Sequence, residues 1–284
     1  MKILITGKDS YIGTSFEKWV EQYGDTYIVD TIDVRDGSWK EQSFSGYDAI
    51  LHVAGIAHIN PKKVDESLYY KVNRDLAVDL AVKAKQEGVK QFVFLSSMSV
   101  YGIEEGVITK DTPCNPKSSY GKAKLEAEEI IHKLQDTSFS VATLRPPMVY
   151  GKGCKGNYPR LVKVALKLPV FPDIKNERSM IYIDNLNEFI RVLIDDCAKG
   201  VFCPQNQEYV CTSQMVKIIG EVHGKKIKLI KIFNPILRIV RRGIVNKVFG
   251  TLVYEQKISM YKRKFCLYDI NESILIIEER ANKD

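Results

Sequence analysis

The sequence predicts an α/β fold, with a parallel sheet that helices cover on both faces. Short apolar segments alternate with amphipathic segments of helix length, which is the pattern of βαβ units. The first apolar segment leads into a turn of small residues at position 7. After about residue 145, prolines and glycines interrupt the alternation. This change indicates a smaller lobe towards the C-terminus.

The alternation assigns the elements in order. Strands are expected at 2–5, 26–32, 49–53, 91–95 and 141–144. Helices are expected at 14–23, 65–87, 120–135 and 186–194, and Gly88 stands where a helix C-cap belongs. We therefore predict a dinucleotide-binding domain over 1–150, to which 180–198 return, and a substrate-binding lobe made of 151–179 and 199–284.

The N-terminal turn predicts a Rossmann-type, doubly wound sheet. Gly7, Ser10 and Gly13 follow the first strand, and Tyr11 and Ile12 lie where the first helix begins. Backbone N–H groups at such a strand–turn–helix junction can receive a pyrophosphate. We expect these five residues to bind a dinucleotide cofactor.

A second motif predicts alcohol oxidation. Tyr120 and Lys124 are four residues apart and share one helix face. Of the fifteen tyrosines, only Tyr120 has a lysine four residues later. A lysine cation beside the phenol is expected to lower its pKa, so that Tyr120 acts as a base while Ser97, at a strand end, holds a substrate hydroxyl.

These motifs resemble those of the extended short-chain dehydrogenases/reductases, in the NAD-dependent epimerase/dehydratase group that acts on nucleotide sugars. The resemblance runs from residue 1 to about 193. Its segments are Thr6-Gly7…Gly13, His52-Val53-Ala54-Gly55, Val72-Asn73, Ser96-Ser97-Met98-Ser99-Val100-Tyr101-Gly102, Tyr120-Gly121-Lys122-Ala123-Lys124, Leu144-Arg145-Pro146, Val149-Tyr150-Gly151 and Arg178-Ser179-Met180-Ile181-Tyr182-Ile183-Asp184.

The resemblance implies catalytic roles for Ser97, Tyr120 and Lys124. It also implies that Ala54, Gly55 and Asn73 lie near the cofactor together with Tyr120 and Lys124. One position departs from the family pattern. Ser10 stands where the family usually has a glycine, which lets the backbone approach the pyrophosphate, so the departure bears on cofactor affinity.

The choice of cofactor depends on the end of the second strand. Asp33 lies there, twenty residues after Gly13, and a carboxylate at this point accepts the ribose hydroxyls of NAD. Asp30 takes that role if the strand ends earlier. Arg35 leaves NADP open, because a nearby arginine accommodates a 2′-phosphate.

The second lobe contains candidates for a substrate diphosphate. Asn157 precedes Pro159 in a loop rich in glycine and lysine, and a helix beginning there offers an anion site. Arg178 matches the family arginine that binds the same diphosphate, a role that its planar guanidinium suits. We expect both residues to bind substrate.

Charge and cysteine content exclude several classes of function. The net charge is +7, but 217–247 alone carry +8, from nine Lys or Arg and one Glu. No nucleic-acid motif accompanies this region, so nucleic-acid binding is not expected. The six cysteines form no CxxC pair and there are only four histidines, so neither a metal site nor disulfides are expected, and a reducing cytoplasm fits best.

Membrane contact is expected only at the surface. The sequence has no apolar run of about eighteen residues, and it begins directly with a strand pattern rather than a leader. A basic amphipathic helix is expected at 235–249, with Arg238, Arg241 and Arg242 on one face. It either lies on the inner membrane face or packs on protein.

The function that we expect is a nucleotide-sugar epimerase of surface-polysaccharide precursor synthesis, which transiently oxidises C4 of a UDP-linked sugar with bound NAD. A reductase of a 4-keto-6-deoxy nucleotide sugar is the alternative, and a non-catalytic cofactor-binding or scaffold protein is a third reading. A dehydratase is disfavoured, because Met98 and Ser99 stand where family dehydratases place an acidic pair. The resemblance also implies a homodimer.

Overall fold

The computed structural model describes residues 1–57, 65–232, 234 and 244–281. Contacts divide the chain into two compact units. Unit 1 comprises Met1–Gly102, Pro113–Pro146 and Asn187–Pro204, and unit 2 comprises Ile103–Thr112, Pro147–Leu186 and Gln205–Asp284.

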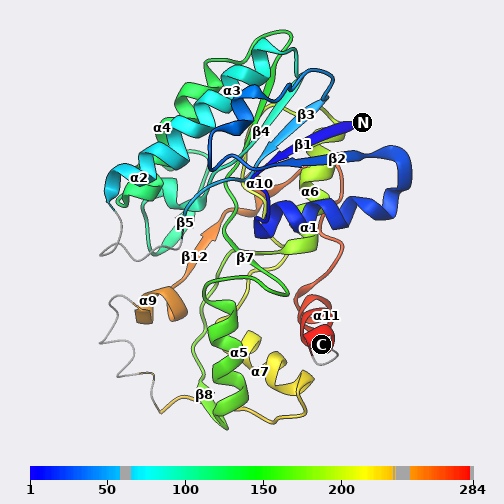
Figure 1. Cartoon of the computed structure of the whole chain (residues 1–284). Coiled ribbons are helices and arrows are strands. Elements are labelled where there is room, and N and C mark those ends of the chain that lie inside the picture. The colour runs from blue at the N-terminus through cyan, green and yellow to red at the C-terminus, as the bar shows by residue number, and fades with distance from the viewer. Residues whose placement is uncertain (58–64, 233, 235–243, 282–284) are drawn as a thin grey trace. The chain divides into compact units, whose positions relative to one another are not determined.

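Unit 1 is built on a six-stranded sheet of order β10-β6-β4-β3-β1-β2, in which every pairing is parallel (Figure 1). The strands are β1 (Lys2–Thr6), β2 (Ile28–Ile32), β3 (Ala49–His52), β4 (Gln91–Leu95), β6 (Ser140–Leu144) and β10 (Gly200–Phe202). The predicted fold class is confirmed, and the five expected strands are present with ends within two residues of their predicted positions.

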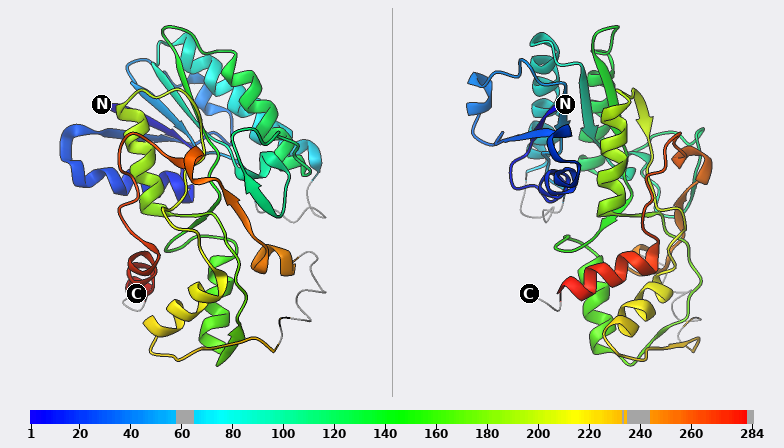
Figure 2. Two further views of the ribbon diagram at one scale, coloured as in Figure 1. Left: turned by 180° about the vertical axis from the view of Figure 1, so that it is seen from behind. Right: turned by 90° about the vertical axis from the view of Figure 1, so that its right-hand side faces the viewer.

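Helices cover both faces of this sheet (Figures 1 and 2). One face carries α2 (Glu66–Tyr70), η3 (Lys71–Asp75), α3 (Leu76–Gln86) and α4 (Ser119–His132), and the other carries α1 (Tyr11–Val20) and α6 (Ile183–Asp195). Short 3₁₀ turns η1 (Glu21–Thr26), η2 (Ser38–Glu41) and η4 (Met98–Tyr101) complete the unit. Fully buried apolar side chains of the sheet, α3 and α4 form one core, which fixes where the ends of β4 and α4 lie.

Two predicted helices differ in detail. The helix expected at 65–87 is divided by η3, a five-residue π-helical turn between α2 and α3. The first helix begins at Tyr11 instead of 14, because the Ser10 side chain caps it by accepting from Gly13 N at 3.1 Å. Gly88 adopts a φ of 78° just after α3, as expected of a C-cap glycine.

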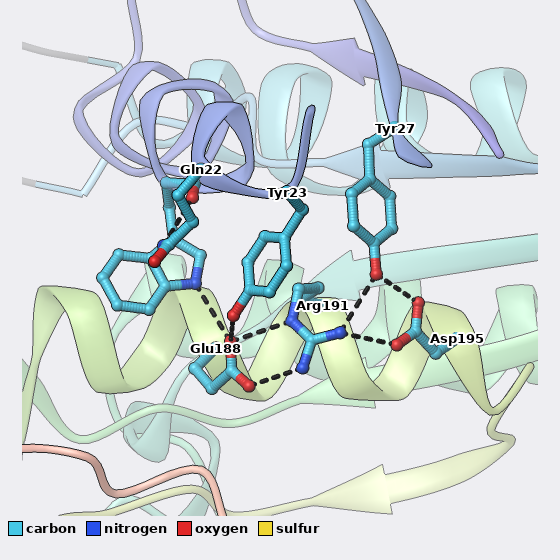
Figure 3. A network of polar contacts seen from close by, with 7 residues as sticks. Gln22, Tyr23, Tyr27, Glu188, Arg191 and Asp195 are labelled. Atoms are coloured by element: carbon cyan, nitrogen blue, oxygen red, sulfur yellow. Dashed lines mark hydrogen bonds and ion pairs between the residues drawn. The ribbon is translucent and has the colours of Figure 1, made fainter. Parts of the chain in front are cut away.

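A buried polar network joins α6 to α1 and η1 (Figure 3). Glu188 accepts hydrogen bonds from Trp19 Nε1 at 3.1 Å and Tyr23 Oη at 3.0 Å. Arg191 donates to Glu188 at 2.6 Å and to Asp195 at 2.7 Å. Charged groups are costly to bury unless paired in this way, so the network fixes α6 on its face of the sheet.

Unit 2 has three two-stranded parallel sheets, which pair β5 (Gly106–Ile108) with β12 (Leu252–Tyr254), β7 (Met148–Tyr150) with β9 (Met180–Tyr182), and β8 (Val170–Pro172) with β11 (Lys228–Ile230). Its helices are α5 (Tyr158–Lys167), α7 (Thr212–Val222), α9 (Ile244–Phe249), α10 (Gln256–Ser259) and α11 (Ile270–Ala281). The buried Glu278 carboxylate joins three helices, because it contacts Tyr158 Oη at 2.6 Å and His223 Nε2 at 2.8 Å (Figure 2).

Most of the expected basic helix at 235–249, with Arg238, Arg241 and Arg242, lies outside the described residues; α9 is its described part. Within the ranges that the structure describes, no helix is long and apolar enough to cross a membrane.

Candidate active site

The carboxyl ends of the central strands bring the predicted residues to one edge of the unit 1 sheet. The registers pair Thr6 with His52 and His52 with Phe94, so these strands end level with each other. Gly7 directly follows β1, and Ala54 and Ser97 each lie two residues after the ends of β3 and β4. Ligands of doubly wound sheets bind at this edge.

The turn after β1 requires glycine at its first position. Gly7 has a φ of 119°, and a Cβ there would lie 2.9 Å from Ala54 N, a conformation and a contact that side chains avoid. At Gly13 a Cβ would lie 2.6 Å from Ser10 Oγ and 3.0 Å from Ile5 Cγ2. Close packing within the protein therefore admits only glycine at both positions. A glycine turn that leads from a parallel strand into a helix N-terminus fits a dinucleotide pyrophosphate.

Ser10 modifies this fit. Its hydroxyl accepts from Gly13 N, and its carbonyl accepts from Thr14 N at 2.9 Å and from Thr14 Oγ1 at 2.9 Å. One of the amides at the helix start therefore already has a partner from within the protein. An anion bound at this position competes with Ser10 for the Gly13 N–H.

Asn73 fixes the loop that follows β3. It is fully buried within η3, where its Oδ1 accepts from Ile56 N at 3.0 Å and its Nδ2 donates to Ile56 O at 3.1 Å. A Cβ at Gly55 would lie 2.7 Å from Asn73 Oδ1 and 3.4 Å from Lys124 Nζ. The Gly55 backbone thus lies between these two side chains, and no larger residue fits there.

Ser97, Tyr120 and Lys124 meet at the end of β4. Ser118 caps α4 by accepting from Gly121 N at 3.1 Å, which places Tyr120 in the first turn of the helix. Ser97 Oγ accepts from Ser99 N and donates to Ser99 Oγ, both at 3.1 Å, and its hydroxyl is near enough to Tyr120 to lower the pKa of the phenol. One turn further along α4, the buried Lys124 Nζ donates to Leu95 O at 2.8 Å and lies 4.7 Å from the centre of the Phe94 ring. The three predicted catalytic residues are therefore grouped.

The electrostatics of this group differ from the prediction. Burial raises the pKa of Tyr120 above 10, and the nearby Ser97 hydroxyl counteracts this only in part. Burial also lowers the pKa of Lys124 to about 7. The expected lowering of the Tyr120 pKa by Lys124 is thus wrong for the protein by itself, because desolvation outweighs other influences on both groups.

A layer of charged and polar residues behind Lys124 was not predicted as part of the site. Glu128, 2% exposed, accepts from Arg145 Nε at 3.1 Å on both oxygens, and Ser96 Oγ donates to it. Arg145 also donates to Tyr101 Oη at 2.9 Å. Tyr120, Lys124 and Glu128 are each four residues apart, and this spacing was the signal in the sequence that could have found this layer.

Asp33 lies just after β2, as expected, but it has a partner. The Arg35 backbone N and side-chain Nε each donate to Asp33 Oδ1 at 2.9 Å. This pairing lowers the pKa of the Asp33 carboxyl to about 2. The rival Asp30 lies within β2, where Tyr47 Oη donates to it at 2.7 Å, so Asp33 is the carboxylate at the strand end.

The two predicted diphosphate ligands lie in unit 2. Asn157 precedes α5, and its side chain makes no capping hydrogen bond to that helix. Arg178 is half-buried, its Nη1 donates to Gly250 O at 3.3 Å, and burial lowers its pKa while Glu105 raises it. Their predicted roles in substrate binding remain predictions.

Comparison with known proteins agrees with this geometry. Residues 3–202 match the NAD dependent epimerase/dehydratase family. A UDP-glucose 4-epimerase of Vibrio cholerae is 30% identical to the chain over 286 residues, which cover 88% of this chain and 86% of that protein.

Solved structures share the fold across the whole chain. A dTDP-4-dehydrorhamnose reductase from Clostridium acetobutylicum superposes with a TM-score of 0.76 at 19% identity, covering 99% of this chain and 100% of the other. A UDP-glucuronic acid 4-epimerase from Bacillus cereus in complex with NAD gives a TM-score of 0.75 at 18% identity, covering 100% and 99%. At these identities the likeness concerns the fold alone, which epimerases and reductases share.

Proposed function

We propose that this chain, which belongs to the NAD dependent epimerase/dehydratase family, is a nucleotide-sugar epimerase that acts by transient oxidation of the sugar C4 hydroxyl. The observation that carries the proposal is the grouping of Ser97, Tyr120 and Lys124 at the carboxyl end of β4. A protein that only binds a cofactor has no need of a phenol and a lysine grouped with a serine at that edge.

In the proposed mechanism, Ser97 Oγ holds the substrate hydroxyl and Tyr120 Oη accepts its proton. Lys124, as an ammonium, stabilises the phenolate form of Tyr120 that accepts this proton and becomes a phenol. When bound, NAD supplies the hydride acceptor that oxidation of an alcohol requires. Tyr120 then returns the proton when the keto sugar is reduced on its other face, so the enzyme ends the cycle in its starting protonation state.

The residues proposed to hold NAD are those of the sheet edge. Gly7 and the start of α1 are proposed to bind the pyrophosphate, and Asp33 is proposed to bind the adenosine ribose. Asn73 and the turn at Ala54-Gly55 are proposed to lie near the nicotinamide. The position of Gly7 in the turn after β1, and of Gly13 in the first turn of α1, supports this assignment. The Asp33–Arg35 pair bears on the choice between NAD and NADP. The Asp33 carboxylate suits the ribose hydroxyls of NAD, whereas the Arg35 guanidinium suits the 2′-phosphate of NADP.

A UDP-linked sugar is the proposed substrate, because the Vibrio cholerae relative is a UDP-glucose 4-epimerase. Asn157 and Arg178 are proposed to bind its diphosphate. The setting that we propose is the cytoplasm, where the enzyme acts as a homodimer, and contact with the inner membrane face through 235–249 belongs to the same proposal.

A reductase of a 4-keto-6-deoxy nucleotide sugar is the second candidate. An epimerase retains its cofactor through every cycle, whereas a reductase must exchange it. Because the Ser10 hydroxyl already accepts from Gly13 N, the pyrophosphate of a cofactor is bound less tightly there. Weaker binding favours exchange of the cofactor. The likeness to a dTDP-4-dehydrorhamnose reductase shows that the fold also suits this activity.

One experiment distinguishes the two. The purified protein is incubated with UDP-glucose or UDP-N-acetylglucosamine without added cofactor, and the products are separated by chromatography, with Tyr120→Phe as the matched inactive control. The C4 epimer is expected from the wild type only. If neither sugar yields its C4 epimer, and NADH or NADPH is consumed on a 4-keto-6-deoxy nucleotide sugar, the reductase would be established instead.

A further inference from the structure

Glu128 lies on the same face of α4 as the catalytic pair. Tyr120, Lys124 and Glu128 are spaced by four residues, so each lies about one turn from the next. The Lys124 and Glu128 side chains are almost wholly buried, at 3% and 2% exposure. A buried lysine with a carboxylate one turn away is in a position to remain charged, whereas a buried lysine without one tends to lose its proton.

The Glu128 carboxylate is held rigidly. Arg145 Nε donates to both of its oxygens at 3.1 Å, Arg145 Nη2 donates to one of them, and Ser96 Oγ donates to the other. Each carboxylate oxygen thus accepts from two donors. The negative charge is therefore fixed behind Lys124, on the side away from Tyr120.

The charged and titratable groups around this pair come from several elements. Lys124 faces His52 from β3, and Glu128 faces Arg145 after β6 and His132 at the end of α4. Cys114, in the loop before α4, is also within reach of Glu128 and Arg145. Burial lowers the pKa of His52 well below 6.5, so this histidine is neutral at pH 7 and adds no charge next to Lys124.

We propose that Glu128 is a positioning residue, whose carboxylate, fixed by Arg145 and Ser96, holds Lys124 in its ammonium form beside Tyr120. The consequence for the reaction rests on the proposed function, since it is the ammonium that stabilises the Tyr120 phenolate. With the pKa of Lys124 lowered to about 7 by burial and raised by Glu128, loss of the carboxylate leaves the lysine neutral at physiological pH.

The direct test measures the protonation of Lys124. Lysine side chains are labelled with ¹³C at Cε, the signals are followed by NMR against pH, and the Lys124 signal is assigned by its loss in Lys124→Arg. In Glu128→Gln the titration midpoint is expected to fall by about one pH unit. Glu188→Gln is the matched control, because it makes the same change in another buried carboxylate–arginine pair of unit 1, and its midpoint should equal that of the wild type.

Two further variants keep the test decisive. Glu128→Asp retains the charge and should keep the midpoint near the wild-type value. If Glu128→Gln does not fold, Glu128→Met/Arg145→Met removes both charges together and leaves neither unpaired, and its Lys124 midpoint is expected to fall as well. An unchanged midpoint in whichever of these charge-removing variants folds would overturn the proposal.

Kinetics then connect the midpoint to catalysis. The alkaline limb of kcat/KM should move to lower pH in Glu128→Gln by the same shift as the NMR midpoint, whereas a purely structural role would reduce activity equally at every pH. A shifted midpoint with an unmoved alkaline limb would refute the catalytic part alone. If no nucleotide sugar is turned over, the proposed function fails, and the NMR result stands separately.

Discussion

Two buried carboxylate–guanidinium pairs in unit 1 have the same chemistry and different neighbours. Glu128 with Arg145 is 2% and 11% exposed, and Glu188 with Arg191 is 6% and 10% exposed. The first pair joins α4 to the end of β6 and adjoins Lys124. The second lies within α6, and its remaining partners are aromatic side chains of α1 and η1 and the carboxylate of Asp195 (Figure 3).

The difference teaches that burial of an ion pair does not by itself indicate function. Both pairs satisfy their hydrogen bonds, and both would be strongly destabilised by loss of one partner. What distinguishes Glu128 is the buried Lys124 one turn away on α4, whose pKa the Glu128 carboxylate raises against the effect of burial. The Glu188 network has no such neighbour in the catalytic group, so its contribution is to stability.

The largest expected effect is a loss of turnover in the catalytic group next to the Glu128–Arg145 pair. Tyr120→Phe should lower kcat by about 10²–10⁴-fold, the usual contribution of a positioned general base, while NAD binding stays near normal because the ring is retained. Turnover on a nucleotide sugar and calorimetric titration with NAD measure the two. Turnover within a few-fold of the wild type would remove Tyr120 from the mechanism. The Glu128–Arg145 pair would then have no catalytic neighbour to distinguish it from the Glu188–Arg191 pair.

The next effect lies on the Glu188 side. Arg191→Met leaves the buried Glu188 and the half-buried Asp195 without their cation and should lower the free energy of unfolding by about 3 kcal/mol. Urea unfolding measures this. The activity per folded molecule should equal that of the wild type, since the residue is remote from Ser97 and Tyr120. A selective loss of kcat in folded protein would contradict the comparison.

Lys124 gives a pH-dependent effect that Arg191 cannot give. Its pKa is about 7 in the folded protein and near 10.5 when unfolded, so the unfolded chain binds the extra proton and stability rises with pH between these values. The stability of Lys124→Met relative to the wild type should therefore be greater at pH 6 than at pH 10 by about 4 kcal/mol. Urea unfolding at both pH values tests it; an equal difference at both would exclude a lowered pKa.

The smallest expected effect concerns the cofactor end of unit 1. Ser10→Gly frees the Gly13 N–H for the pyrophosphate and should tighten NAD binding by about fivefold, roughly 1 kcal/mol, at a cost to the helix of only a few tenths. Calorimetric titration measures the affinity, and Ser38→Gly, at an exposed turn, is the control. Weaker binding instead would mean that the Ser10 hydroxyl itself contacts the pyrophosphate.

The fold and the grouping of Ser97, Tyr120 and Lys124 could be predicted, because strand ends in a parallel sheet meet at one edge and residues four apart share a helix face. The direction in which the Tyr120 pKa is shifted could not be predicted. It depends on how deeply the ring is buried, which is set by residues from separate parts of the chain.

Other differences have local causes. The spacing of Asp33 and Arg35 did not decide whether the two side chains pair. They do pair, through two contacts, because the chain turns after β2, and the strand pattern does not predict that turn. The early start of α1 follows from the Ser10 cap. Glu128 was visible in the sequence at four residues after Lys124 and was missed, because an isolated glutamate on a helix is usually solvated.

The π-helical turn η3 has a consequence for how this chain aligns with others. A π turn contains one residue more than the α-helical turn it replaces, and Asn73 lies within it, facing the loop after β3. Deleting one residue from Lys71–Asp75 would restore an α-helical turn continuous with α2 and α3. The buried Leu80 and Ala84 would keep their place on the core face, whereas the bulge that presents Asn73 to the loop would be lost. In a comparison of homologous chains, a one-residue gap at this place is therefore expected to occur together with a change of the residue at position 73.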